Sequence, residues 1–124
     1  MGVINITPDS FYAGSRVENT EQILQEVAKM VKEGADIIDV GGQSTRPGSK
    51  PLSANEEWDK IRLPLHQIVQ TFPNTIISVD TYQSRVAENA LQAGVHIIND
   101  ISAGEMDSEM LSTVAHFGAP YICM

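Results

Sequence analysis

Residues 34–48 read Gly-Ala-Asp-Ile-Ile-Asp-Val-Gly-Gly-Gln-Ser-Thr-Arg-Pro-Gly, and this stretch indicates how the whole chain folds. Residues 37–40 form a largely apolar run, which is typical of a buried strand. Gly34 stands where the amphipathic helix predicted over residues 20–32 has to end. Glycines and a proline follow the strand and predict a loop over residues 41–53. The stretch therefore predicts a helix, a strand and a loop in succession.

The same unit recurs along the chain. A glycine ends a predicted helix just before a predicted strand at Gly34, Gly94 and Gly118. Such repetition predicts parallel strands joined by helices. The predicted strands cover residues 3–6, 37–40, 75–79 and 95–98, with a fifth from residue 120, and the predicted helices cover residues 20–32, a segment after Ser53, residues 83–93 and a segment after Asp107.

Three local signals bear on the helix ends. Ser53 and Glu56 have the spacing of a capping box, which predicts the start of the second helix. Pro64 is expected to kink or interrupt that helix, because proline lacks a backbone N–H. Asp107 is expected to cap the fourth helix. Acidic residues on the helices are expected to lie on solvated faces.

Polar residues at the carboxyl ends of successive strands distinguish between two folds. Five strands and four helices suit both an open doubly wound sheet and part of a barrel. An open sheet binds its ligand at one switch point, whereas a closed barrel gathers all strand ends around one pocket. We therefore predict an α/β fold, a parallel (β/α)8 TIM barrel of which this chain supplies strands 1–5 and helices 1–4. The polar strand ends are Asn5, Thr7, Asp39, Asp80, Thr81, Asn99 and Asp100.

Composition narrows the classes of partner. The 124 residues carry a formal net charge of −8, which argues against nucleic acid and anionic membranes as partners. No apolar run approaches the roughly 20 residues that cross a bilayer. The single cysteine, Cys123, is expected to be a buried thiol in a reducing, cytoplasmic setting. Strand-like sequence at both ends leads us to expect a truncated chain, residues 1–124 being the N-terminal part of one barrel domain.

Taken one at a time, the polar residues leave alternatives open. Asn5 offers an amide oxygen to a hard cation, or it satisfies nearby backbone. Asp80 and Asn99 match the edge of a flat heterocycle, or Asp80 or Thr81 merely caps the next helix. Arg46 offers a fork for phosphate or carboxylate, or it is a solvated loop residue.

Four motifs, at residues 1–11, 34–48, 77–81 and 98–101, together resemble those of the dihydropteroate synthase family in order and spacing. The resemblance implies an eight-stranded barrel and a transferase of folate biosynthesis that uses Mg2+. Its reaction joins (7,8-dihydropterin-6-yl)methyl diphosphate to 4-aminobenzoate and releases diphosphate, and sulfonamides compete for the aminobenzoate pocket. It further implies a homodimer when the protein is full length.

The resemblance also assigns roles to individual residues. The pterin site comprises Asp80, Asn99, Ile101 and Met124, with Thr45 as a contact to the pterin diphosphate. Asn5 is assigned to magnesium, and Phe11 and Pro47 to the walls of the aminobenzoate pocket. Asp9 and Arg46 are assigned as catalytic charged residues at the tips of two loops that close over the site.

The chain departs from the family pattern in places. Gln43 stands where the family usually has glutamate, and residues 12–15 differ from the family's commoner small, acidic and glycine-rich stretch. The family's later motifs, including a lysine, an arginine and a histidine that grip the substrate, do not occur in these 124 residues. We therefore expect this chain alone to be inactive. Two rival hypotheses are a methyltetrahydrofolate-binding barrel that serves a corrinoid methyltransferase, and a non-catalytic fragment that binds pterin.

Overall fold

The computed structural model describes residues 1–6, 16–43 and 47–123, and for residues 16–18 the backbone alone. These residues contain a five-stranded parallel sheet in the order β1-β2-β3-β4-β5. An open doubly wound sheet reverses its strand order at a switch point, so the uninterrupted order confirms the arrangement predicted for a barrel. The barrel is not closed, because β1 and β5 are the two edges of the described sheet. The strands are β1 (Gly2–Asn5), β2 (Ile37–Gly41), β3 (Ile76–Asp80), β4 (Ile97–Asp100) and β5 (Tyr121–Cys123).

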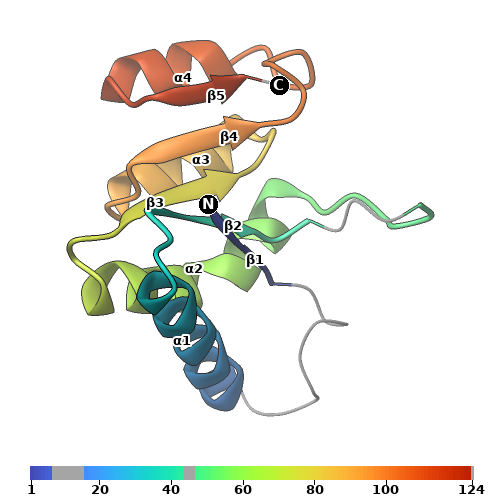
Figure 1. The fold of residues 1–124 in the computed structure, drawn as a ribbon. Helices are drawn as coiled ribbons and strands as arrows, with labels where there is room; N and C mark the ends of the chain where they lie inside the picture. Colours follow the sequence, from blue (N-terminus) through green and yellow to red (C-terminus); the bar gives the residue numbers. More distant parts are fainter. Residues whose placement is uncertain (7–15, 44–46, 124) are drawn as a thin grey trace.

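Four helices form a layer beside the sheet, with α1 packed on α2, α2 on α3 and α3 on α4 (Figure 1). Alternate strand residues, among them Ile38, Val40, Val79 and Ile98, are fully buried in the core. The other strand residues therefore face away from the helices. The helices are α1 (Arg16–Lys32), α2 (Ala54–Thr71), α3 (Ser84–Gln92) and α4 (Met110–Phe117).

The predicted helix ends are confirmed at several places. The Ser53 hydroxyl accepts a hydrogen bond from the Glu56 N–H, and the Glu56 carboxylate accepts one from the Ser53 N–H, each at 3.2 Å. Gly34, Gly94 and Gly118 all have positive φ, as glycines that end helices should.

The structure differs from other local expectations. Pro64 does not interrupt α2, which runs unbroken from Ala54 to Thr71; Pro64 is itself buried among core residues of that helix, so packing offsets the lost hydrogen bond. The N-cap of α4 is Glu109, two residues after the predicted Asp107, although the Asp107 Oδ1 accepts from the Glu109 N–H at 3.0 Å. The Asp107 Oδ2 accepts from the Ser84 N–H at the start of α3, at 2.7 Å. Cys123 is exposed rather than buried, because β5 lies at a sheet edge.

Within the parts of the chain that the structure describes, none of the helices combines the length and the apolar composition that crossing a bilayer requires.

Candidate functional site

A row of polar residues crosses the carboxyl ends of the strands. The register pairs Asn5 with Gly41, Gly41 with Asp80, and Asp80 with Asn99. Residues in register in a parallel sheet point to the same face, so the three side chains project together. They project away from the helices, because Val40, Val79 and Ile98 beside them are in the core. The expectation that the polar strand ends meet is confirmed for these residues.

Gly41 leaves a gap in this row. A Cβ placed on Gly41 would lie 3.5 Å from the Asn5 Oδ1 and 3.8 Å from the Asp80 Oδ2. The side chains of Asn5 and Asp80 thus flank one unfilled position above β2. A glycine here permits close approach of a ligand to the backbone.

A buried carboxylate fixes the Asn99 amide. The Asp39 carboxylate accepts hydrogen bonds from the Ser78 hydroxyl and from the Asn99 Nδ2, the latter at 3.3 Å. Asp39 is 4% exposed and Asn99 6% exposed. With its N–H group turned to Asp39, Asn99 keeps a buried Oδ1 that has no hydrogen-bond partner within the described residues. A buried acceptor left over in this way needs a donor that the described residues do not supply.

Asp80 is half-buried among other acids. Burial, and then the carboxylates of Asp39 and Asp100, raise the pKa of Asp80 to about 6. Asp80 makes no hydrogen bond to the start of α3 among the described residues, whereas the Thr81 hydroxyl accepts from the Gln83 N–H at 3.1 Å. The capping alternative therefore holds for Thr81 and not for Asp80. Asp80 is left as an acceptor for a ligand.

Asp100 organises the loop after β4. Its oxygens accept from the N–H groups of Ser102 at 2.8 Å and Gly104 at 2.9 Å, and from the Tyr121 hydroxyl at 2.7 Å. Burial raises its pKa, but the bonds from Tyr121, Ser102 and Gly104 outweigh burial and lower it below the ordinary value. Fully committed inside the fold, Asp100 is structural.

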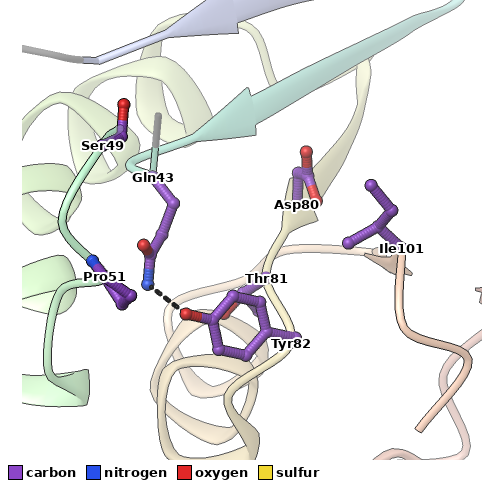
Figure 2. Close-up of a pocket in the computed structure, with 7 residues that line it drawn as sticks. All are labelled: Gln43, Ser49, Pro51, Asp80, Thr81, Tyr82 and Ile101. Carbon is purple, nitrogen blue, oxygen red and sulfur yellow. Dashed lines mark hydrogen bonds between the residues drawn. The ribbon is translucent and has the colours of Figure 1, made fainter. Parts of the chain in front are cut away.

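A cavity of about 130 Å³ opens beside Asp80 (Figure 2). Ile101, assigned to the pterin site by resemblance, lines it together with Asp80, although its side chain is 54% exposed. Figure 2 shows Ser49 and Pro51 on the side opposite Asp80 and Ile101. Among the described residues, the cavity is lined by Gln43, Ser49, Pro51, Asp80, Thr81, Tyr82 and Ile101.

Of the other sequence-predicted residues that the structure describes, Asn5 and Asn99 do not line this cavity. Pro47 is exposed and does not line it. Five residues fall outside the described part of the chain, so their predicted roles stay predictions: Asp9, Phe11, Thr45, Arg46 and Met124.

Sequence reasoning gave no site role to Tyr82 or Glu57, and it named Asp39 only as one of the polar strand ends. Asp39 lies two residues before Gly41 on the same strand, so alternation places it on the same face as the row. Tyr82 directly follows a strand end that was singled out. The burial of Glu57 had no such signal, because an acid on an amphipathic helix is typical of a solvated face, yet its exposed fraction is 0%.

The described residues offer no group of three His, Cys, Asp or Glu side chains fit to hold a metal on their own. Asn5 alone presents an amide oxygen beside the Gly41 gap. Mg2+ commonly takes one or two protein oxygens and completes its shell with water and substrate phosphates. The donor set at Asn5 therefore fits a magnesium ion that a phosphorylated ligand brings with it.

Known proteins of similar sequence show to which family this chain belongs. A family described as pterin binding enzyme matches residues 1–124. The dihydropteroate synthase of Streptococcus pyogenes is 42% identical over 124 residues, which are 100% of this chain and 46% of that protein.

Two solved structures are also similar. A Clostridium difficile dihydropteroate synthase crystallised with pteroic acid has a TM-score of 0.91 at 38% identity over 99% of this chain and 46% of that one. A Xanthomonas albilineans dihydropteroate synthase with 4-aminobenzoic acid has a TM-score of 0.90 at 33% identity over 99% of this chain and 44% of that one. The chain thus spans less than half the length of these relatives and matches the N-terminal portion of the enzyme. From its first residue to its last, this chain belongs to the pterin-binding enzyme family.

Proposed function

We propose that this chain forms the pterin half of a dihydropteroate synthase. The observation that carries the proposal is the row of Asn5, Asp80 and Asn99, with its gap at Gly41, in a chain whose relatives are dihydropteroate synthases. The methyltransferase and non-catalytic alternatives are not favoured by those relatives.

Asp80 and Asn99 would hold the aminopyrimidinone edge of the pterin. That edge presents N–H donors, and the two strand ends supply acceptors: the Asp80 carboxylate and the Asn99 Oδ1 that lacks a partner among the described residues. With a pKa of about 6, Asp80 is mostly ionised at neutral pH and accepts without donating. Ile101 would cover the ring from the cavity wall.

The Gly41 gap would admit the methylene group that joins the pterin to its diphosphate. Asn5, on the far side of the gap, would then hold magnesium, which neutralises charge on the departing diphosphate when bound. The C–O bond to diphosphate breaks, the amine nitrogen of 4-aminobenzoate forms a C–N bond to the methylene carbon, and the amine loses one proton. An arylamine is a weak nucleophile, so this alkyl transfer depends on positioning.

We keep the roles that resemblance assigns to Asp9 and Arg46 at the loop tips, to Thr45 and Met124 at the pterin substrate, and to Phe11 and Pro47 at an aminobenzoate pocket open to sulfonamides. Because the chain spans 46% of the Streptococcus pyogenes enzyme, we further propose that turnover needs strands beyond these five.

A chimera tests the proposal. Residues 1–124 replace the matched segment of the Streptococcus pyogenes enzyme, and turnover of pterin diphosphate with 4-aminobenzoate is measured. The chimera is expected to turn over, its Asn99→Ala variant to lose at least about tenfold in kcat/KM, and the 124-residue chain alone to be inactive. A folded chimera without turnover contradicts the function, and turnover by the chain alone contradicts the need for further strands.

A further inference from the structure

The side chain of Gln43 joins the end of β2 to Leu52, just before α2. Its Oε1 accepts a hydrogen bond from the Leu52 N–H at 3.2 Å, and its Nε2 donates one to the Leu52 carbonyl at 3.3 Å. An amide side chain paired in both directions with one backbone unit acts like a short rung of sheet. This pairing holds Leu52, and with it the described residues 47–51 that precede it, near the end of β2.

The same amide also faces two other elements. Its Nε2 lies 3.2 Å from the hydroxyl of Tyr82, a bond that Figure 2 shows, and 3.5 Å from the Glu57 Oε2 on α2. Tyr82 follows Thr81, the first residue after β3. An amide has two N–H hydrogens, so these acceptors and the Leu52 carbonyl share them. The end of β2 and Leu52 are thereby joined to α2 and to the end of β3.

Glu57 explains why an amide is needed. Its side chain is fully buried, and burial raises its pKa even though hydrogen bonds from Gln83, Thr81 and Gln43 oppose that effect. A buried carboxylate requires donors, and here they are two amides and a hydroxyl. Gln83 also donates to the Leu52 carbonyl, at 3.3 Å. Both glutamines therefore connect the buried acid to Leu52.

This network forms one wall of the cavity. Gln43, Thr81 and Tyr82 line it, and so do Ser49 and Pro51, which precede Leu52. Figure 2 shows Gln43 between Ser49 and Pro51 on one side and Asp80 and Ile101 on the other. The distance across the cavity thus depends on where residues 47–52 are held.

We propose that Gln43 is a positioning residue, which sets the width of the ligand cavity by fixing residues 47–52 to the buried Glu57. Glutamate at position 43 would still accept from the Leu52 N–H, but it would donate nothing to the Leu52 carbonyl, Tyr82 or Glu57. It would also add a second carboxylate beside a buried one. The part of the proposal that concerns the ligand rests on the proposed function; the part that concerns residues 47–52, the loop before α2, does not.

Hydrogen exchange in the 124-residue chain tests the loop. In Gln43→Glu, amides in peptides covering residues 47–53 are expected to exchange at least tenfold faster. The exchanged pair, Gln43→Glu with Glu57→Gln, is expected to exchange at least threefold more slowly than Gln43→Glu alone, because it again places one amide beside one carboxylate, although residue 43 still donates nothing to the Leu52 carbonyl. Gln70→Glu, on the exposed surface of α2, is the control and should change nothing. Gln43→Met, which keeps the length and removes the hydrogen bonds, should loosen the loop as well if Gln43→Glu does not fold.

Binding of pteroic acid tests the ligand. Gln43→Glu is expected to bind it at least tenfold more weakly than the unchanged chain, and the exchanged pair is expected to recover part of that affinity. Unchanged exchange in both Gln43 variants, or an exchanged pair that stays loose, would overturn the loop assignment. A loosened loop with unchanged pteroic acid affinity would overturn the link to the cavity. Failure of the unchanged chain to bind pteroic acid would count against the proposed function, and the exchange rates would still decide the loop.

Discussion

Asp80 is a single carboxyl group whose protonation is coupled to folding. Its pKa in the folded chain is about 6, against an ordinary value of 3.8, because of burial and the charges of Asp39 and Asp100. The folded chain therefore holds this proton more tightly than the unfolded chain. The stability that the proton contributes is fully present below the ordinary pKa and is lost as pH rises through the folded pKa. Asn at position 80 does not titrate. The melting temperature of Asp80→Asn minus that of the unchanged chain should therefore increase as the pH is raised from about 4 to about 7.

Thermal unfolding of both chains across that pH range measures the difference. Asn74→Ser, an exposed change without a titratable group, is the control, and its difference from the unchanged chain should stay constant. A constant difference for Asp80→Asn as well would mean that Asp80 titrates alike in the folded and unfolded chains.

Gly41 is predicted to act through the side chain that it lacks. In Gly41→Ala the new Cβ meets the Asn5 Oδ1 and the Asp80 Cβ at 3.5 Å, which is ordinary van der Waals contact, so the chain should fold normally. The methyl group nevertheless occupies the gap proposed for the ligand. We expect affinity for 6-hydroxymethylpterin monophosphate, measured by calorimetry, to fall at least about tenfold, or about 1.4 kcal/mol.

Gly42 provides the contrast for that experiment. A Cβ on Gly42 would lie 2.7 Å from the Ile61 Cγ2 in the core, so Gly42→Ala should lower the free energy of unfolding by about 1 to 3 kcal/mol. Urea unfolding separates the two variants. If Gly41→Ala binds as tightly as the unchanged chain, the gap is not where the ligand passes.

At the scale of elements, the capping box of α2 fixes where the loop after β2 ends. Ser53→Ala removes the hydroxyl that accepts from the Glu56 N–H and should cost about 1 kcal/mol of unfolding free energy. Urea unfolding at neutral pH measures this loss, with Ser108→Ala in an exposed turn as the control. Equal stability of the two variants would show that the cap adds nothing beyond the packing of α2 on the sheet.

The elements themselves could be predicted because their signals are local. Apolar runs, the Ser53 cap and the glycines at 34, 94 and 118 depend on neighbours in the sequence, and the structure confirms them. Pro64 and Glu57 could not be predicted in this way. Whether a proline breaks a helix, or an acid is solvated, depends on what packs against them, and both lie buried on the sheet side of α2.

At the scale of the whole molecule, the polar row could be predicted and the Gln43 network could not. Asn5, Asp80 and Asn99 meet because parallel strands bring their carboxyl ends to one edge, which follows from the order of the strands. The bond from Gln43 to Leu52 depends on the path of an irregular loop, and its reach to Glu57 depends on the packing of α2. Neither of these two hydrogen bonds produces a periodic pattern in the sequence.

The open sheet of the described chain leads to a prediction about association. β1 and β5 are edge strands, and the face turned away from the helices leaves Val3 52% exposed and Ile76 41% exposed. Edges and apolar faces of this kind pair with other chains. We therefore expect the 124-residue chain to self-associate as its concentration rises, as measured by sedimentation velocity.

A charged substitution on the open face of the sheet distinguishes association through that face from non-specific association. Val3→Lys places an ammonium group on the inner face of β1, outside the core, and should weaken self-association by about tenfold, or about 1.4 kcal/mol. Leu63→Lys changes a 39% exposed leucine on α2 in the helical layer and should leave association unaltered. If both lysines weaken it equally, the contact is not specific to the open sheet. If the unchanged chain stays monomeric throughout, the edges and the open face of the sheet do not drive association.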